Sequence, residues 1–222
     1  MGKTIELTAP DGHRLLAYRA EPVGNPKGGL IVVMEIFGVN SHIRGVADGY
    51  AGDGYLVIAP ALFDRAQRGY ETGYSPDEIQ RGREMIAKIN LDDTMKDVAA
   101  ARDNVSSAGK IGILGYCWGG TVAWKASAEV AGLHCAVPYY GGGIPGLIRL
   151  KPNCPVMFHW GEADQSIPLD KAKEFAAAHK DHTHHFYAAG HGFNCDQRAS
   201  YNAEAARLAR RRTLEFLAEH LG

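Results

Sequence analysis

Short apolar runs without polar alternation recur along this chain, and segments with helical spacing separate them. Residues 29–34, 55–59 and 110–114 are such runs, and they are typical of strands buried on both faces of a sheet. Strands that alternate with helices pair mostly in parallel, because each helix returns the chain to the same end of the sheet. The pattern therefore predicts an α/β fold, a mostly parallel sheet with helices on both faces, in a single domain over residues 1–222.

The other predicted elements follow the same alternation. Residues 4–9 and 13–21 flank an Asp11–Gly12 turn and predict an N-terminal hairpin. We expect helices over 43–53, 76–89, 91–105, 118–130, 169–179 and 199–221, and further strands over 134–139, 156–160 and 184–187. Residues 61–75 are rich in glycine, tyrosine and charge, which predicts a surface excursion.

The composition excludes some classes of partner. The formal net charge is −1, so no overall basic field would gather nucleic acid or anionic lipid. We interpret the basic stretch at 207–212 as the solvated face of the last helix. No stretch approaches the roughly 20 apolar residues that span a bilayer, and residues 1–6 show no signal-peptide core. From these features we expect a cytoplasmic protein that binds neither nucleic acid nor membrane.

Cys117 lies within the stretch GYCWGG at 115–120, where a predicted strand leads directly into a predicted helix. This is the nucleophile-elbow pattern, with cysteine where serine usually stands. Glycines at 115 and 119 leave space where strand and helix pass close together. The turn would present the thiol at the carboxyl end of the sheet, and the helix N-terminus would favour a thiolate. The alternative is an inert cysteine in a glycine-rich turn.

A cysteine nucleophile needs a base, and the base needs a group that orients it. Behind such an elbow the chain order is nucleophile, acid, histidine. Asp164 and His191 follow Cys117 in that order, each in a loop after a predicted strand. Glu162 is the competing acid, and we favour Asp164 because its loop leads into the next helix.

The remaining cysteines and histidines have simpler interpretations. Four cysteines without a CxxC pair predict neither a disulfide framework nor a zinc site. We expect Cys135 and Cys154 to pack in the core. A local cluster consists of His179, His182, His184 and His185. We expect no metal there, because adjacent strand residues point to opposite faces of a sheet.

Five motifs occur in the order found in the dienelactone hydrolase family, which this chain resembles along nearly its whole length. They are MEIFGVN at 34–40, GYCWGG at 115–120, YYG at 139–141, WGEAD at 160–164 and GHGF at 190–193. Each motif is weak alone, but the five together are specific. The resemblance implies an α/β-hydrolase fold and hydrolysis of a lactone or ester, as in a carboxymethylenebutenolidase.

The resemblance implies a catalytic triad of Cys117, His191 and Asp164. The thiolate would attack the substrate carbonyl, His191 would manage the protons, and Asp164 would hold the imidazole. Water would then resolve a thioester acyl-enzyme. No metal or organic cofactor is implied. The expected partner is a small-molecule ester or lactone, and we expect a monomer, with a dimer as the alternative.

The resemblance also implies a role for Glu35, in the loop after a buried strand. In this family a glutamate at this place contacts the resting thiol and is displaced by substrate. A buried carboxylate there can hold or take the thiol proton, whereas a salt-bridged loop carboxylate is the alternative interpretation. The oxyanion donors would be the backbone N–H of Trp118, at the elbow, and that of Ile36, which the resemblance supplies.

Family members that act on dienelactone bind its carboxylate with two arginines. The first corresponds to Arg81, with Arg83 close by, and the second is missing from its place just after His191. Arg198 is the candidate replacement. Because half of the anion clamp is missing, a neutral or bulkier ester is the alternative substrate. The expected substrate-binding residues are Arg81, Phe37, Tyr139, Tyr140 and Phe193, and Trp118 is a further candidate for the pocket wall.

A thiol redox-sensing protein is the alternative from another functional class. Cys195 lies four residues after His191, and a reversible disulfide between Cys117 and Cys195 would report redox state. A hydrolase predicts acylation of the thiol, whereas a sensor predicts peroxide sensitivity without ester turnover. A third alternative, a binding module that keeps the fold, predicts neither.

Overall fold

The computed structural model describes residues 2–222 and contains an eight-stranded sheet in the order β1-β2-β4-β3-β5-β6-β7-β8. The strands are β1 (Lys3–Thr8), β2 (Arg14–Ala20), β3 (Gly29–Val33), β4 (Leu56–Pro60), β5 (Ile111–Tyr116), β6 (Cys135–Tyr139), β7 (Met157–Gly161) and β8 (Thr183–Tyr187). The β1–β2 and β2–β4 pairs are antiparallel, and the other neighbouring pairs are parallel. The predicted fold class is therefore confirmed.

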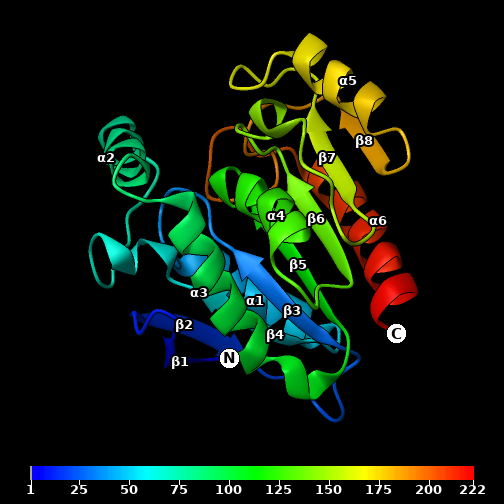
Figure 1. Cartoon of the computed structure of the whole chain (residues 1–222). Coiled ribbons are helices and arrows are strands. Elements are labelled where there is room, and N and C mark those ends of the chain that lie inside the picture. Colours follow the sequence, from blue (N-terminus) through cyan, green and yellow to red (C-terminus); the bar gives the residue numbers. More distant parts are fainter. Residues whose placement is uncertain (1) are drawn as a thin grey trace.

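Helices cover both faces of this sheet. They are α1 (Ser41–Gly52), α2 (Pro76–Ile86), α3 (Leu91–Asn104), α4 (Trp118–Glu129), α5 (Leu169–Ala178) and α6 (Ala203–Leu221), with short 3-10 turns η1 (Leu62–Arg65), η2 (Ser106–Ala108) and η3 (Pro145–Leu147). Figure 1 shows α3 and α4 on one face and α1 and α6 on the other. The helix α2 lies beyond the carboxyl ends of the central strands (Figure 1). This position makes α2 a candidate cover for a site at the end of the sheet.

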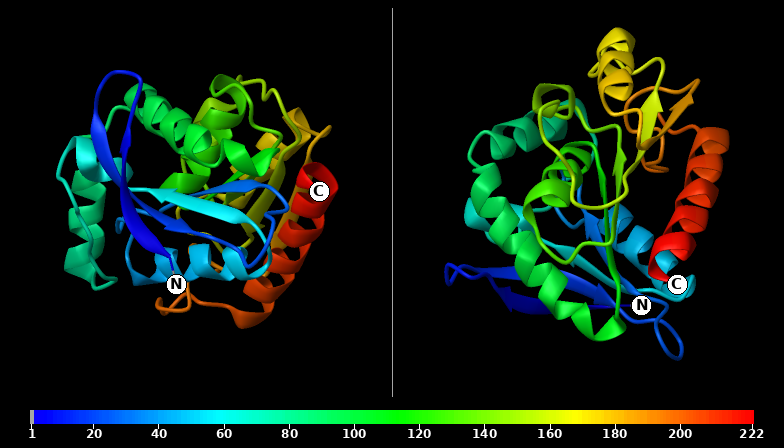
Figure 2. Two further views of the ribbon diagram at one scale, coloured as in Figure 1. Left: turned by 90° about the horizontal axis from the view of Figure 1, so that it is seen from below. Right: turned by 45° about the vertical axis from the view of Figure 1, so that its right-hand side comes forward.

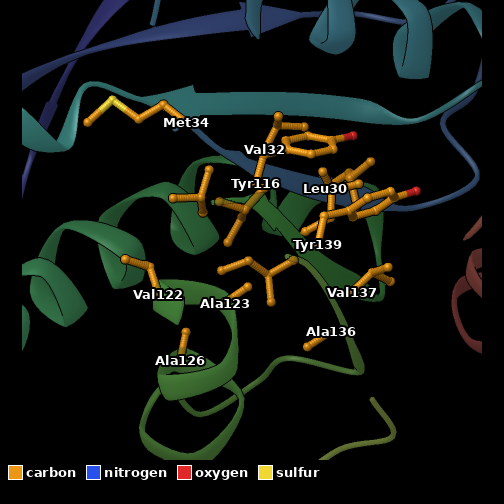
Figure 3. Packing of buried hydrophobic residues seen from close by; sticks show 14 of the residues in the cluster. Leu30, Val32, Met34, Tyr116, Val122, Ala123, Ala126, Ala136, Val137 and Tyr139 are labelled. Carbon is orange, nitrogen blue, oxygen red and sulfur yellow. The ribbon is translucent and has the colours of Figure 1, made fainter. Parts of the chain in front are cut away.

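The central strands are buried along their whole length, as their continuous apolar sequences predict. Every residue of β3, β4 and β5 is buried. Figure 3 shows Val122 and Ala123 of α4 in one cluster with Leu30 of β3 and Val137 of β6. Burial of such side chains contributes about 25 cal/mol per Å² of apolar surface. The packing fixes α4, and with it the turn that precedes it, against the sheet.

Two expected helix boundaries and one expected exposure are wrong, and the first of these is the helix expected over 76–89, which ends at Ile86. The last helix begins at Ala203 rather than at 199, because the Asn202 side chain caps it and accepts a hydrogen bond from the Ala205 N–H at 3.0 Å. The segment 61–75 does not lie wholly on the surface, since Leu62 and Phe63 are buried in η1.

The hairpin of β1 and β2 forms one edge of the sheet, and β8 forms the other. In the left view of Figure 2, the hairpin (blue) lies on one side of the molecule and α6 (red) on the other. Within residues 2–222, the structure contains no helix long and apolar enough to cross a membrane.

Candidate active site

Cys117 lies between the end of β5 and the first residue of α4, with φ 55° and ψ −120°. A residue with a side chain adopts such a positive φ only at a cost of about 1–3 kcal/mol, which the surrounding packing must offset. A methyl group at Gly115 would overlap the Gly119 carbonyl, and one at Gly119 would overlap the Met34 carbonyl. The two glycines therefore allow the close passage of strand and helix that the sequence predicts.

His191 and Asp164 connect to Cys117 through a chain of hydrogen bonds. The Nε2 atom of His191 lies 3.0 Å from the Cys117 Sγ, and its Nδ1 atom lies 2.8 Å from the Asp164 Oδ2. The Asp164 Oδ1 accepts hydrogen bonds from the N–H groups of Ser166, at 2.7 Å, and Ile167, at 3.1 Å. The carboxylate is thus held from one side while it orients the imidazole on the other.

Glu162, the competing acid, is exposed, whereas Asp164 is buried with 5% of its surface accessible. Both residues follow β7, but the turn at its end directs only Asp164 toward His191. The structure brings together the three residues named for the triad, and it leaves Glu162 outside their hydrogen-bonded chain.

The surroundings of His191 change its proton affinity. Burial by itself would lower the pKa of the imidazole, but the negative charge of Cys117 and the hydrogen bonds to Asp164 and Cys117 outweigh it. Together they raise the pKa of His191 to about 10. The raised pKa favours the imidazolium form of His191 at neutral pH, and an imidazolium beside a cysteine is an arrangement that activates the sulfur as a nucleophile.

We expect NMR titration of the His191 ring to show a midpoint near pH 10, with imidazolium below it and neutral imidazole above it. In Cys117→Ala the midpoint should fall, because the charge of Cys117 is the largest cause that raises the pKa. The His220 ring, in α6, provides an internal control in the same spectra. Equal His191 midpoints in the two proteins would contradict the thiolate–imidazolium pair.

A cavity of about 450 Å³ opens beside the thiol. Cys117 and His191 line it, together with Ile36 and Trp118, the two residues expected to supply oxyanion donors. The Trp118 N–H is the first of α4, a position that has no intrahelical acceptor. The other lining residues are Ile79, Arg83, Ile86, Ile89, Leu91, Thr121, Gly142, Gly143, Ser166 and Arg198.

Arg81, the expected substrate-binding arginine, does not line this cavity. Its side chain is 56% exposed and its guanidinium lies 3.9 Å from the Glu78 carboxylate. Arg83 lines the cavity instead. Ile79, Arg83 and Ile86 are spaced by four and three residues, so they share one face of α2, whereas Arg81 lies on another.

The aromatic residues expected to bind substrate lie behind the cavity rather than along it. The group of Phe37, Tyr139, Tyr140 and Phe193 is buried, with at most 1% of each residue accessible. The Tyr140 ring packs 5.3 Å from the His191 ring and 5.1 Å from that of Phe193. The hydroxyl of Tyr139 lies 2.6 Å from that of Thr213 in α6. These side chains support the histidine and the sheet, and only Trp118 of the expected aromatic walls lines the cavity.

Glu35 pairs with Arg198 rather than with the thiol. The Arg198 Nη1 donates to the Glu35 Oε1 at 3.0 Å, and Glu35 is 1% exposed. Gly192 leaves space for this pair, since a methyl group there would overlap the Arg198 guanidinium in its present position. Arg198 lines the cavity but forms an ion pair with Glu35. It would therefore bind a substrate carboxylate more weakly than an unpaired arginine would.

The histidine cluster directs two of its rings at the backbone. The His179 Nε2 lies 2.8 Å from the Ile148 carbonyl, and the His184 Nε2 lies 3.0 Å from the His179 carbonyl. The His184 Nδ1 also accepts a hydrogen bond from the Trp160 Nε1 at 3.2 Å, so both nitrogens of that ring are already in hydrogen bonds. The His184 ring also stacks on Phe158, with the centroids 4.7 Å apart, so packing accounts for its position.

Comparison with known proteins identifies the family. The sequence model of the dienelactone hydrolase family matches residues 15–221. A carboxymethylenebutenolidase of Pseudomonas putida is 31% identical over 228 residues, which cover 96% of this chain and 95% of that protein. A protein of Synechocystis sp., provisionally named a carboxymethylenebutenolidase, is 35% identical over 227 residues, which cover 92% of each chain.

A solved structure from Klebsiella pneumoniae, provisionally named a dienelactone hydrolase, has the same fold. It superimposes with a TM-score of 0.81 at 31% sequence identity and covers 99% of each chain. The match to the family model extends over nearly all of the sheet and helices described above. The chain therefore belongs to the dienelactone hydrolase family of carboxylic ester hydrolases.

Proposed function

We propose that this protein hydrolyses a small-molecule ester or lactone with Cys117 as nucleophile, His191 as acid and base, and Asp164 as the residue that orients His191. The observation that carries the proposal is the unbroken hydrogen-bonded chain from Asp164 through His191 to the Cys117 thiol, which ends at a cavity. Nucleophile, base and orienting acid in this arrangement are the requirements for acyl transfer through a covalent intermediate.

The first half of the reaction forms a thioester. The Cys117 thiolate attacks the carbonyl carbon, and the charge that develops on the carbonyl oxygen is stabilised by the N–H groups of Trp118 and Ile36. When the intermediate collapses, the imidazolium of His191 gives its proton to the departing alkoxide. The acyl group remains on the Cys117 sulfur, and His191 is left neutral.

The second half uses water. Neutral His191 takes a proton from a water molecule, whose oxygen attacks the thioester carbonyl, and the carboxylic acid product leaves as the thiolate is restored. Asp164 holds the ring so that Nε2 faces the reacting atoms throughout. Glu35 takes no part in these steps while its carboxylate is paired with Arg198.

The proposal is tested by steady-state hydrolysis of p-nitrophenyl acetate and cis-dienelactone, with mass spectrometry of the intact protein after brief mixing. We expect turnover of at least one substrate and an acyl adduct on Cys117 that His191→Ala accumulates more slowly. A protein that turns over neither substrate, while its Cys117 still reacts with iodoacetamide, would contradict the hydrolase and favour the redox alternative. Burial of Cys195 disfavours that alternative, because oxidation of thiols follows their exposure.

A neutral ester with a bulky apolar group is the second candidate substrate, and the lining of the cavity favours it. Five aliphatic side chains line the cavity, namely those of Ile36, Ile79, Ile86, Ile89 and Leu91. Each methylene that they bury contributes about 0.8 kcal/mol, or roughly fourfold in binding. We therefore expect kcat/KM for p-nitrophenyl esters to rise from acetate to butyrate to hexanoate.

Arg83 provides the remaining charge for an acidic substrate. We expect Arg83→Gln to lower kcat/KM for cis-dienelactone by about 10–100-fold, because a hydrogen bond to a charged group contributes about 1.5–3 kcal/mol. Arg81→Gln is the matched control on the same helix and should change it less than twofold, since Arg81 lies outside the cavity. Parallel kinetics with p-nitrophenyl butyrate separate the loss of the Arg83 charge from a general disturbance of the cavity. Loss of the charge alone should leave kcat/KM for a neutral ester nearly unchanged. The reverse ranking of the two arginines would contradict this assignment.

A further inference from the structure

Three buried side chains with metal-ligating atoms converge outside the catalytic chain of hydrogen bonds. Among residues 2–222, one oxygen of Glu35, one ring nitrogen of His42 and the Cys195 sulfur lie within 4.8 Å of one another. Glu35 follows β3, His42 lies in the first turn of α1, and Cys195 lies in the loop after β8. Their exposed fractions are 1%, 6% and 0%, so solvent does not compete for these atoms.

Two of these side chains have an atom without a hydrogen-bond partner. The Glu35 Oε2 and the His42 Nε2 are both buried and unpaired. Buried polar atoms without partners are uncommon and indicate a bound water or ion. The Cys195 thiol has a single proton, which can serve only one of these two acceptors, and the Tyr74 hydroxyl is a further hydrogen-bond partner of its sulfur. The cluster therefore has more acceptor lone pairs than protons to fill them, and a bound cation would accept the unfilled lone pairs.

The second polar atom of His42 and of Glu35 already has a hydrogen-bond partner outside the cluster. The His42 Nδ1 lies 3.0 Å from the Asp196 Oδ1, and because an ionised carboxylate only accepts, the proton is on Nδ1, which leaves a lone pair on the unpaired Nε2. The Glu35 Oε1 accepts from Arg198 at 3.0 Å, which leaves Oε2 for the cluster. Histidine ligands of metals in proteins almost always donate their second nitrogen to a carboxylate or carbonyl in this way.

We propose that Glu35, His42 and Cys195 form a binding site for a divalent cation of the zinc class. One thiolate, one imidazole and one carboxylate suit a zinc-like ion, with a water as the fourth ligand. On binding, the Cys195 thiol loses its proton to solvent and its sulfur donates an electron pair to the metal. A second cavity, of about 520 Å³, is lined by both His42 and Asp196 and so reaches one side of the cluster.

The site is independent of whether the enzyme cleaves esters, so its test uses a spectroscopic signal. We expect cobalt(II), added to chelator-treated protein, to give the intense visible absorption of a tetrahedral ion and a thiolate-to-cobalt charge-transfer band, both removed by added zinc. Cys195→Ser should lose the charge-transfer band. Asp196→Asn should weaken cobalt binding by about 10–100-fold, because it removes the group that orients His42.

Two variants keep the experiment specific to this cluster. Cys117→Ser should retain the full cobalt spectrum, which distinguishes the site from the reactive thiol near the cavity. Cys154→Ser, at a buried cysteine outside the cluster, controls for general loss of structure, as does circular dichroism of each variant. Absence of a cobalt spectrum in the unchanged protein, or its loss in Cys117→Ser but not in Cys195→Ser, would overturn the proposal in favour of a buried water or an ion at the active-site thiol.

Discussion

Replacing Cys117 by alanine is expected to lower kcat/KM by at least about 10⁴-fold for every ester the protein cleaves. No other described side chain at the cavity pairs a nucleophilic atom with a base in the way that the Cys117 sulfur pairs with the His191 Nε2. Without the sulfur, the remaining catalysis comes from the oxyanion donors and from binding alone. The measurement is steady-state hydrolysis of p-nitrophenyl acetate, with thermal unfolding recorded for each variant.

Cys154→Ala is the matched control for this loss. Cys154 is a free cysteine like Cys117, but it is buried, and burial raises the pKa of its thiol to about 11, which keeps it protonated and unreactive at neutral pH. We expect this variant to retain activity within about twofold. If Cys117→Ala kept more than about a tenth of the activity, the thioester mechanism would be wrong and a direct attack by water would replace it.

The nucleophile elbow could be predicted from sequence because local sterics alone define it. A strand, a turn with glycine on both sides of the central residue, and a helix leave only one arrangement in which the backbones do not overlap. Asp164 and His191 were predicted as partners of Cys117 from their order in the chain, not from distances. That order could not decide whether Asp164 or Glu162 contacts His191. The decision required the turn after β7, whose backbone N–H groups hold the Asp164 carboxylate.

The residues that line the cavity were harder to predict, because the direction of each side chain decides whether it reaches the cavity. Arg81 and Arg83 are two residues apart, so they point to different faces of α2, and only Arg83 reaches the cavity. The helical spacing of Ile79, Arg83 and Ile86 was a signal that would have separated them. Tyr139, in contrast, carries no such signal, because its packing against Thr213 joins β6 to a helix more than 70 positions away. Contacts of that range depend on the tertiary fold.

The pairing of Glu35 with Arg198 also depends on a long-range relation. Sequence pattern indicated both residues, but their separation is 163 positions, and nothing local says which residue a buried carboxylate will meet. Gly192 links the two observations. Its lack of a side chain leaves the space that the Arg198 guanidinium occupies, so the position of Arg198 depends on a residue six positions earlier as well as on Glu35.

Asp164→Asn is expected to lower kcat by about 10⁴-fold while leaving the fold intact, an effect of the size seen when the equivalent acid of a serine-protease triad is changed. The carboxylate accepts three hydrogen bonds, from the N–H groups of Ser166 and Ile167 and from His191. An asparagine has one oxygen, which the two backbone donors would hold, so its NH₂ group would face the His191 Nδ1. The ring would then carry its proton on Nε2 and present a donor, where the mechanism needs a base.

Glu162→Gln is the matched control, two residues earlier on the same turn. Its side chain is exposed and lies outside the hydrogen-bonded chain, so we expect its kcat to change less than twofold. The two variants should unfold at similar temperatures, because both substitutions conserve shape. An activity loss in Glu162→Gln that matched or exceeded that in Asp164→Asn would transfer the orienting role to Glu162. Equal and small losses in both would instead mean that His191 acts without a carboxylate partner and that the Cys117 sulfur alone sets its orientation and charge.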